Sequence, residues 1–264
     1  KHVFCEKPIT VNYELSCEMA EEAKKQGKLL NIGVCNRYNA PVEMLRQYNL
    51  EGKFGNLYNV YCSFRNFRSI PGLGGAFTTK AQSGGGVLID WGVHYLDLVM
   101  YCMNDPEPKT VSAQTYSKLA TNMRDYVFES MWAGPPDYSG TYDVEEFVTG
   151  FIRTEGPTMT FNGAWAQNIF VPETYIDFIG TKGGIRLKYG ADFELFTVTN
   201  GKLTTEKPEF DNTANMFNQE INHFIDCIRS GEHIRSHIDK AEITARIMQG
   251  IYDSAELGRE VSFE

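Results

Sequence analysis

The sequence lacks a long apolar run and an excess of positive charge. Its longest apolar stretch, from Val87 to Met103, is interrupted by Asp90, His94 and Asp97, so it does not predict a membrane-spanning helix. The formal charge is 25 − 34 = −9, which argues against electrostatic binding to nucleic acid or to an anionic membrane. A globular domain with neither partner is therefore expected.

Paired cysteines are also lacking. The six cysteines lie at positions 5, 17, 35, 62, 102 and 227 and form no CxxC motif. Scattered cysteines in a chain of this size indicate free thiols in a reducing compartment. We therefore expect a cytoplasmic protein.

No GxGxxG motif occurs anywhere in the chain, so the glycine fingerprint of dinucleotide binding is missing. The run Gly84-Gly85-Gly86 is not followed by Gly-Lys-Ser/Thr and is not a phosphate loop. We expect these glycines to allow close packing where a helix begins.

What is present at the N-terminal end is a βαβ pattern. Val3 to Glu6 predicts a short buried strand, residues 12–26 a helix capped by Asn12, and Leu29 to Val34 a second strand. A strand, a helix and a strand within about 35 residues predict a parallel sheet with a right-handed crossover. Two strands cannot bury both faces of such a sheet, so we expect further strands beside them.

The rest of the chain predicts a mostly antiparallel sheet with helices on one face. Expected helices cover 41–50, 87–103, 213–229 and 239–257, and expected strands cover 56–66, 110–116, 144–153, 158–166, 174–180, 184–188 and 193–198. The fold class is thus α/β (α+β), a βαβ remnant followed by a large, open, mostly antiparallel sheet. We divide the chain into 1–36, part of a dinucleotide-binding domain, and 37–264, a substrate-binding and oligomerisation domain.

The helix at 87–103 carries the strongest chemical pattern, because Asp90, His94 and Asp97 fall in one stripe at about 100° per residue. His94 could act as a general base, with Asp90 or Asp97 orienting the ring or the substrate. A solvent-facing polar stripe explains the same pattern. Asp and His at i, i+4 could also share a metal ion, but one helix offers too few ligands and no metal is expected.

Two further motifs follow predicted strands. Glu6-Lys7-Pro8 ends the first strand and Asn36-Arg37-Tyr38 follows the second. Ligands of open α/β sheets bind beyond the carboxyl ends of strands, where Lys7 could place positive charge beside a developing alkoxide. A surface Lys and a surface Arg in ordinary loops are the alternatives.

Together these motifs resemble the Gfo/Idh/MocA oxidoreductases, the family of glucose–fructose oxidoreductase and inositol 2-dehydrogenase. The resemblance runs through the whole chain. It rests on Glu6-Lys7-Pro8, on the segment from Gly84 to Asp97, which fits GGG…D-x-G-x-H-x-x-D without a gap, and on Ile179 to Gly184. It implies a Rossmann domain followed by an α/β domain whose open sheet often joins copies into dimers or tetramers.

The resemblance also implies site residues. Lys7 and His94 would be the catalytic pair, with Asp90 binding the substrate and tuning His94. Glu6 and Lys7 would border the nicotinamide ribose of NAD or NADP. Asn36, Arg37 and Trp165 are further candidates for contact with a sugar or polyol, although Trp165 is also typical of a core residue on a strand.

Family members carry a strand, a GxGxxG loop and an acidic ribose-binding residue upstream of Glu6-Lys7-Pro8. We therefore expect that about a hundred or more residues precede this segment in the intact protein, and that the chain alone binds NAD(P) weakly and is inactive. The expected activity of the intact protein is oxidation of a CH–OH group. An NAD-dependent glycosidase of the same family and a non-catalytic assembly module are the alternatives.

Overall fold

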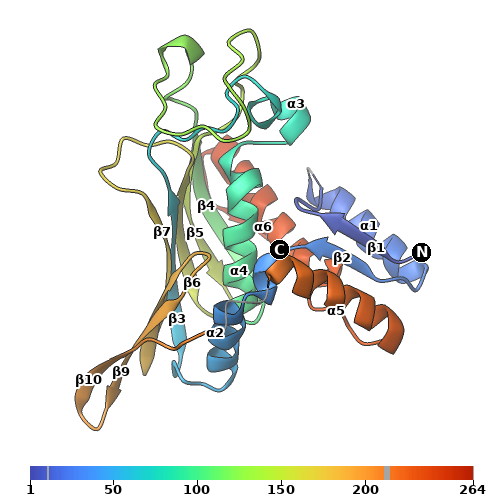
Figure 1. Ribbon diagram of the computed structural model, residues 1–264, viewed down its shortest axis with the longest axis vertical. Helices are drawn as coiled ribbons and strands as arrows, with labels where there is room; N and C mark the ends of the chain where they lie inside the picture. The colour runs from blue at the N-terminus through green and yellow to red at the C-terminus, as the bar shows by residue number, and fades with distance from the viewer. Residues whose placement is uncertain (11, 211–214, 264) are drawn as a thin grey trace.

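The computed structural model describes residues 1–10, 12–210 and 215–263. Figure 1 shows two parts side by side: a large sheet with helices on one face, and a smaller layer of two strands between two helices. The smaller part contains the N-terminal βαβ unit, and the larger part contains the helix with Asp90 and His94.

The βαβ unit has the predicted form. Strand β1 (Val3–Glu6) pairs in parallel with β2 (Leu30–Gly33), and helix α1 (Tyr13–Lys25) connects them. The Asn12 side chain accepts a hydrogen bond from the backbone N–H of Leu15 and caps α1 as predicted. The outer edge of β2 is covered by residues 236 and 237, because the N–H of Ile32 donates to the carbonyl of Ser236.

The large sheet has nine strands in the order β10-β9-β8-β7-β3-β6-β5-β4-β11, and all neighbours are antiparallel except β3 and β6. The strands are β3 (Leu57–Arg65), β4 (Pro108–Tyr116), β5 (Phe147–Thr154), β6 (Thr158–Ala164), β7 (Glu173–Gly180), β8 (Gly183–Lys188), β9 (Phe193–Thr199), β10 (Lys202–Glu206) and β11 (Val261–Ser262). The predicted fold class is confirmed, although β10 and β11 were not predicted. Four of the five residues of β10 are exposed, so its sequence shows little alternation between apolar and polar residues.

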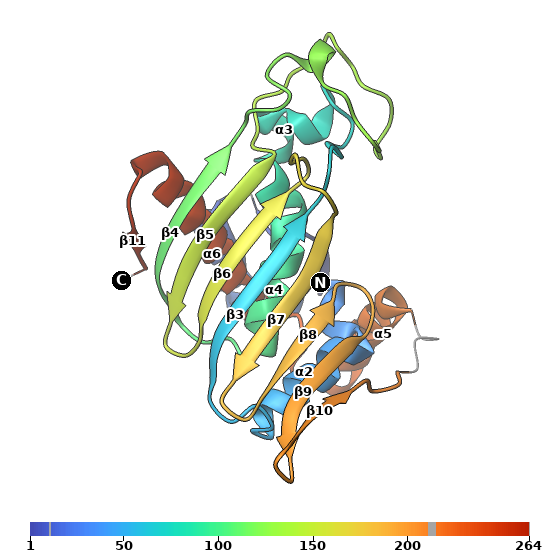
Figure 2. The ribbon, with the colours of Figure 1, turned by 90° about the vertical axis from the view of Figure 1, so that its left-hand side faces the viewer.

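Helices α4 (Val93–Cys102) and α6 (Ile238–Leu257) pack on one face of this sheet, against β3 and β4. Helix α5 (Met216–Ser230) lies along the β1–β2 layer instead. The other helices are α2 (Ala40–Leu50) and the four-residue α3 (Lys80–Ser83), with four short 3-10 or π turns, η1 (Cys35–Tyr38), η2 (Ala76–Thr78), η3 (Leu88–Gly92) and η4 (Met123–Asp125). Figure 2 shows the opposite face of the sheet, which no described helix covers. The start of the helix predicted at 213–229 falls partly on 211–214, outside the described residues.

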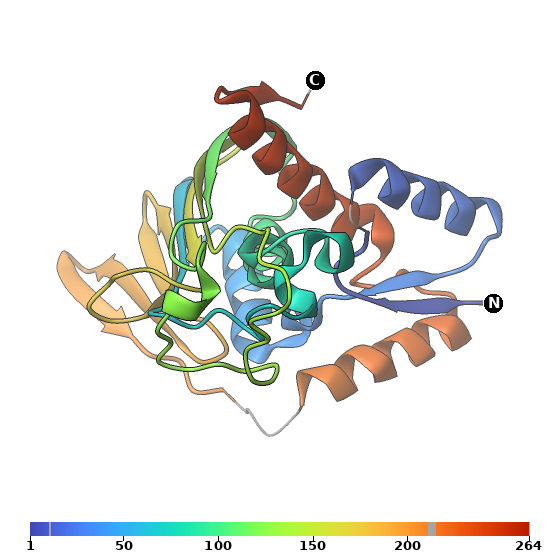
Figure 3. The same ribbon diagram turned by 90° about the horizontal axis from the view of Figure 1, so that it is seen from above.

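Helices from the C-terminal end of the chain pack against the N-terminal βαβ unit. Ile238, Ala241 and Ala245 of α6 pack with Ile32 of β2 and Met19 of α1 in one apolar cluster. On the other side of β1, Phe4 meets Phe224 of α5 edge to face, with ring centroids 5.7 Å apart. Figure 3 shows β1 and β2 between α1 and α5. No described helix is both long and apolar enough to cross a membrane.

Candidate active site

A buried carboxylate sets the start of the helix that carries Asp90 and His94. Glu145 accepts hydrogen bonds from the backbone N–H groups of Gly86 (3.0 Å) and Leu88 (3.1 Å) and from the Tyr252 hydroxyl (2.9 Å). A Cβ on Gly86 would lie 2.0 Å from the carbonyl oxygen of Glu145, so only glycine fits this approach. The close packing predicted for the glycine run is confirmed, and Glu145 is a positioning residue that the motif analysis had not assigned.

The helix does not run as one regular α-helix. Residues Leu88–Gly92 form the π turn η3, and α4 begins at Val93. A π turn has more residues per turn than an α-helix, and such turns occur frequently at functional sites. The ideal spacing of 100° per residue therefore does not hold between Asp90 and His94.

Asp90 is held between two side chains from other elements. Lys7, just beyond the end of β1, donates to the backbone carbonyl of Asp90 at 3.0 Å and to its carboxylate at 3.4 Å. On the other carboxylate oxygen, the indole N–H of Trp165 donates at 3.1 Å. Both charged side chains are mostly buried, with 21% of Lys7 and 11% of Asp90 exposed. Burial raises the pKa of Asp90, although Lys7 and Trp165 act in the opposite direction.

His94 is a neutral base. Burial, and then the positive charge of Lys7, lower its pKa to about 4. Its Nδ1 atom is buried and has no hydrogen-bond partner among the described residues. A buried polar atom without a partner is costly unless a ligand satisfies it. An unprotonated imidazole beside an ammonium and a carboxylate can accept a proton from a substrate hydroxyl while Lys7 stabilises the negative oxygen.

Asn36 reaches the same region through an aromatic stack. Its side-chain amide donates to the Tyr189 hydroxyl at 3.0 Å. The Tyr189 ring stacks on Tyr95 at 4.1 Å between centroids, and Tyr95 stacks on Phe64 at 4.6 Å. Burial raises the pKa of Tyr189 to about 12, and the nearby Asp90 carboxylate adds to the shift. Tyr189 was not predicted, because it follows a strand in a turn without any motif.

Arg37, a predicted substrate contact, lies in the core with its side chain paired to Asp97. Its guanidinium is fully buried and donates to the Asp97 carboxylate at 2.9 Å and 2.6 Å and to the carbonyl of Arg235 at 3.1 Å. Asp97 also accepts a hydrogen bond from Thr244 at 3.4 Å. The pair is a structural link between η1, α4 and α6, so Asp97 is not available to orient His94.

The structure also places Trp165 and Glu6 near this site. Trp165 is fully buried and contacts Asp90 through its indole N–H. Glu6 lies at the carboxyl end of β1 against Gly33, where a Cβ would come within 2.6 Å of its carboxylate. The contact of Trp165 with a sugar and that of Glu6 with a nicotinamide ribose stay predictions.

The charge of Lys7 gives a direct test of this electrostatic arrangement. Because Lys7 is one of two causes of the low pKa of His94, Lys7→Met should raise that pKa from about 4 while leaving it below 6.5, since burial persists. NMR titration of the imidazole Cε1–H signal measures it. Lys25→Met, on the exposed end of α1, is the matched control and should leave the signal unchanged. A wild-type His94 that titrates near its ordinary pKa would contradict the arrangement.

Lys7, Asp90 and Trp165 thus meet, with His94 nearby, where a parallel strand pair meets the helix-covered face of an antiparallel sheet. The comparisons with known proteins give the class. Residues 42–186 match the GFO/IDH/MocA C-terminal domain. The chain therefore belongs to the Gfo/Idh/MocA family of oxidoreductases, and the predicted resemblance is confirmed.

Individual relatives agree with this assignment. The chain is 29% identical over 262 residues to D-glucoside 3-dehydrogenase of Escherichia coli, covering 98% of this chain and 72% of the relative. Aldose-aldose oxidoreductase from Caulobacter crescentus, solved with glycerol, has the same fold with a TM-score of 0.79 at 23% identity, covering 100% of this chain and 72% of that one. Levoglucosan dehydrogenase, solved with NADH and levoglucosan, gives 0.81 at 18% identity, covering 99% and 73%.

Proposed function

We propose that this chain carries the catalytic and substrate-binding residues of an NAD(P)-dependent oxidoreductase that acts on a CH–OH group of a sugar or polyol. The observation that carries the proposal is the neutral His94 near the Lys7–Asp90 pair. Its buried Nδ1 has no hydrogen-bond partner in the part of the chain that the structure describes. The similarity to D-glucoside 3-dehydrogenase favours a glucoside or a related pyranose as substrate.

The residues present fit the nicotinamide end of such a cofactor. Glu6 and Lys7 lie at the carboxyl end of a parallel strand, at the sheet edge where open α/β folds bind dinucleotides. The buried Nδ1 of His94, which has no hydrogen-bond partner among the described residues, could bind a polar group of a ligand there. When bound there, the nicotinamide would accept the hydride. No GxGxxG turn exists in the sequence to hold the pyrophosphate. We therefore propose that residues 1–36 belong to a larger dinucleotide-binding unit, and that this chain alone binds NAD(P) weakly.

The chain's own residues divide the proton chemistry. His94 takes the proton of the substrate hydroxyl, which its low pKa allows at any pH above about 4. Lys7 stabilises the negative charge that develops on the same oxygen, because its ammonium stays beside Asp90 in a mostly buried position. Asp90, fixed by Trp165 and Lys7, accepts a hydrogen bond from a neighbouring substrate hydroxyl.

The bare face of the nine-stranded sheet supports self-association. Exposed apolar side chains of three outer strands, Ile179, Phe196, Val198 and Leu203, lie toward one end of the sheet. Open sheets with exposed apolar positions are commonly covered by a partner. We propose a homo-oligomer formed through this face, which light scattering after gel filtration measures directly.

The six cysteines are free thiols, and four of them are buried. We propose that the protein works in a reducing compartment, and the cytoplasm is the one that this favours.

The proposed activity is tested with NAD⁺ and NADP⁺ against D-glucosides, free aldoses, levoglucosan and inositols, with reduced nicotinamide followed by absorbance. The assay uses this chain alone and, in parallel, a fusion of this chain with a complete dinucleotide-binding domain. Reduction of cofactor by a glucoside or another pyranose supports the proposal. If the fusion turns over none of these sugars and polyols, the proposed activity is contradicted.

A further inference from the structure

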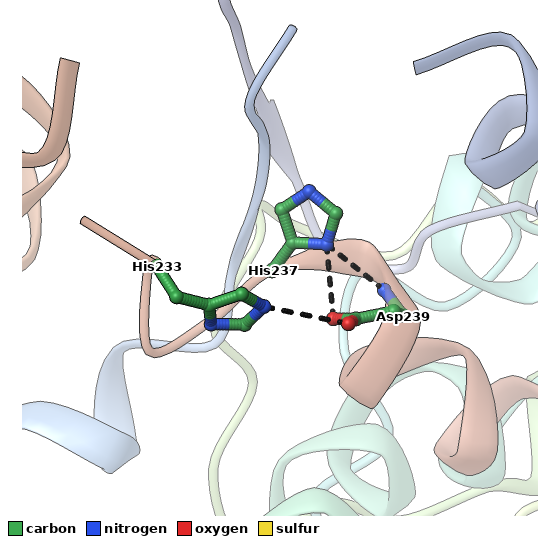
Figure 4. A group of neighbouring side chains, drawn as sticks. All are labelled: His233, His237 and Asp239. Carbon is green, nitrogen blue, oxygen red and sulfur yellow. Dashed lines mark hydrogen bonds and ion pairs between the residues drawn. The ribbon is translucent and has the colours of Figure 1, made fainter. Parts of the chain in front are cut away.

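A second cluster of chemically capable side chains lies at the start of α6. His233, His237 and Asp239 each direct one ligand atom toward the others, and all three atoms fall within 4.8 Å. Figure 4 shows the two imidazole rings beside each other, both near the Asp239 carboxylate. The three residues span a loop and a helix cap, so their spacing of four and two residues forms no recognisable ligand motif.

The distances suit a shared ion. Nε2 of His233 lies 3.4 Å from one carboxylate oxygen of Asp239, and Nδ1 of His237 lies 2.9 Å from the other. Two ligands bound at about 2.0–2.2 Å from one Zn²⁺ ion lie roughly 3 to 4 Å apart. Only small side-chain rotations therefore separate this arrangement from a three-ligand site.

The Nδ1 atom of His237 lies close to two groups of Asp239. It is 3.4 Å from the backbone N–H of Asp239, at the N-cap of α6, and 2.9 Å from an Asp239 carboxylate oxygen. When Nδ1 carries a proton, it donates that proton to the carboxylate. A bound metal ion takes the place of such a proton between the imidazole and the carboxylate.

The backbone holds the cluster in place. His237 forms a bridge with Asn31 of β2, and the adjacent Ser236 donates to the Asn31 side chain at 2.6 Å. The side chain of His237 is 18% exposed, whereas His233 and Asp239 are 63% and 49% exposed. The site is thus anchored at its buried end and open to solvent on the other side.

We propose that His233, His237 and Asp239 form a binding site for a divalent transition metal, with Zn²⁺ as the best fit. Two imidazoles and one carboxylate are ligands that Zn²⁺ accepts in a tetrahedral site, with water in the fourth position. A carboxylate is ionised at neutral pH and can therefore serve as a ligand. The ion would fasten the α5–α6 connection and the first turn of α6 beside the edge of β2.

The test is a calorimetric titration of ZnCl₂ into the chelator-treated, tag-free chain, with thermal unfolding in parallel. We expect one Zn²⁺ per chain and, at a concentration about a hundredfold above Kd, a rise of about 5 °C in the midpoint. His233→Asn and Asp239→Asn should each weaken binding at least about tenfold. His237→Asn removes the imidazole but keeps a capping side chain, and it should weaken binding equally.

His223→Asn is the matched control, because His223 lies in α5, near Cys227 and 3.3 Å from the N–H of Arg235. It should leave Zn²⁺ affinity unchanged. Retained binding in His233→Asn together with loss in His223→Asn would place the ion at His223 and Cys227 and overturn the proposal. No heat and no change in midpoint at 100-fold molar excess of zinc (about millimolar) would overturn it as well. Because His233 is exposed, its variant reports on binding even where a cap variant fails to fold.

Discussion

In a fusion of this chain with a complete dinucleotide-binding domain, His94→Asn should lower kcat by about 10²- to 10⁴-fold. The amide keeps a hydrogen-bonding group at the same position but cannot take the hydroxyl proton at neutral pH. KM for the sugar should change much less, because the substitution removes an interaction made in the transition state. Steady-state kinetics with the best substrate of the sugar screen give both constants.

His2→Asn is the control, because its ring nitrogen accepts a hydrogen bond from the N–H of Leu29, between the start of β1 and the start of β2. It should leave kcat unchanged. Lys7→Met should also lower kcat, and the double variant should lose less than the product of the two single effects, since both residues act on one oxygen. A His94→Asn protein with kcat within a factor of a few of wild type would remove His94 from the mechanism.

Asp97→Asn should lower the free energy of unfolding by about 3–5 kcal/mol. Asp97 and Arg37 each expose only 1% of their side chains, so the substitution leaves a fully buried guanidinium without its counter-charge. Denaturant unfolding at neutral pH measures the loss.

Two controls isolate the buried charge. Asp177→Asn breaks an ion pair with Arg186 whose side chains are 22% and 48% exposed, and it should cost about 1 kcal/mol or less. The double variant Arg37→Met, Asp97→Leu removes both charges and should recover much of the lost stability. An Asp97→Asn protein as stable as Asp177→Asn would show that the pair is not the structural link that its geometry indicates.

Local sequence rules predicted most of the elements. The Asn12 cap, the parallel pairing of Val3 to Glu6 with the second strand, and the alternating strands all follow from caps and periodicity, which depend on near neighbours. Lys7, Asp90 and His94 were found because they belong to dense motifs. The hydrogen bonds between Lys7 and Asp90, which are 83 positions apart, could not be predicted from spacing.

Partners that are distant in sequence could not be predicted. Arg37 was a candidate substrate contact or a surface loop residue, because nothing near it in sequence shows that Asp97, 60 positions later, neutralises it in the core. Trp165 could line a pocket or lie in the core by composition, and its complete burial places it in the core. The gathering of His233, His237 and Asp239 depends on the loop that places His237 against β2.

The central claim is that Lys7, Asp90 and His94 carry out proton transfer while a sugar C–H bond delivers hydride to a nicotinamide. A single-turnover experiment tests this claim. A sugar substrate deuterated at its ring carbons is mixed with NAD⁺ and the fusion of this chain with a complete dinucleotide-binding domain. We predict one deuterium in the reduced cofactor, a primary isotope effect on its formation, and near-complete loss of that step in His94→Asn. Formation of reduced nicotinamide without deuterium, or at an unchanged rate in His94→Asn, would contradict the account.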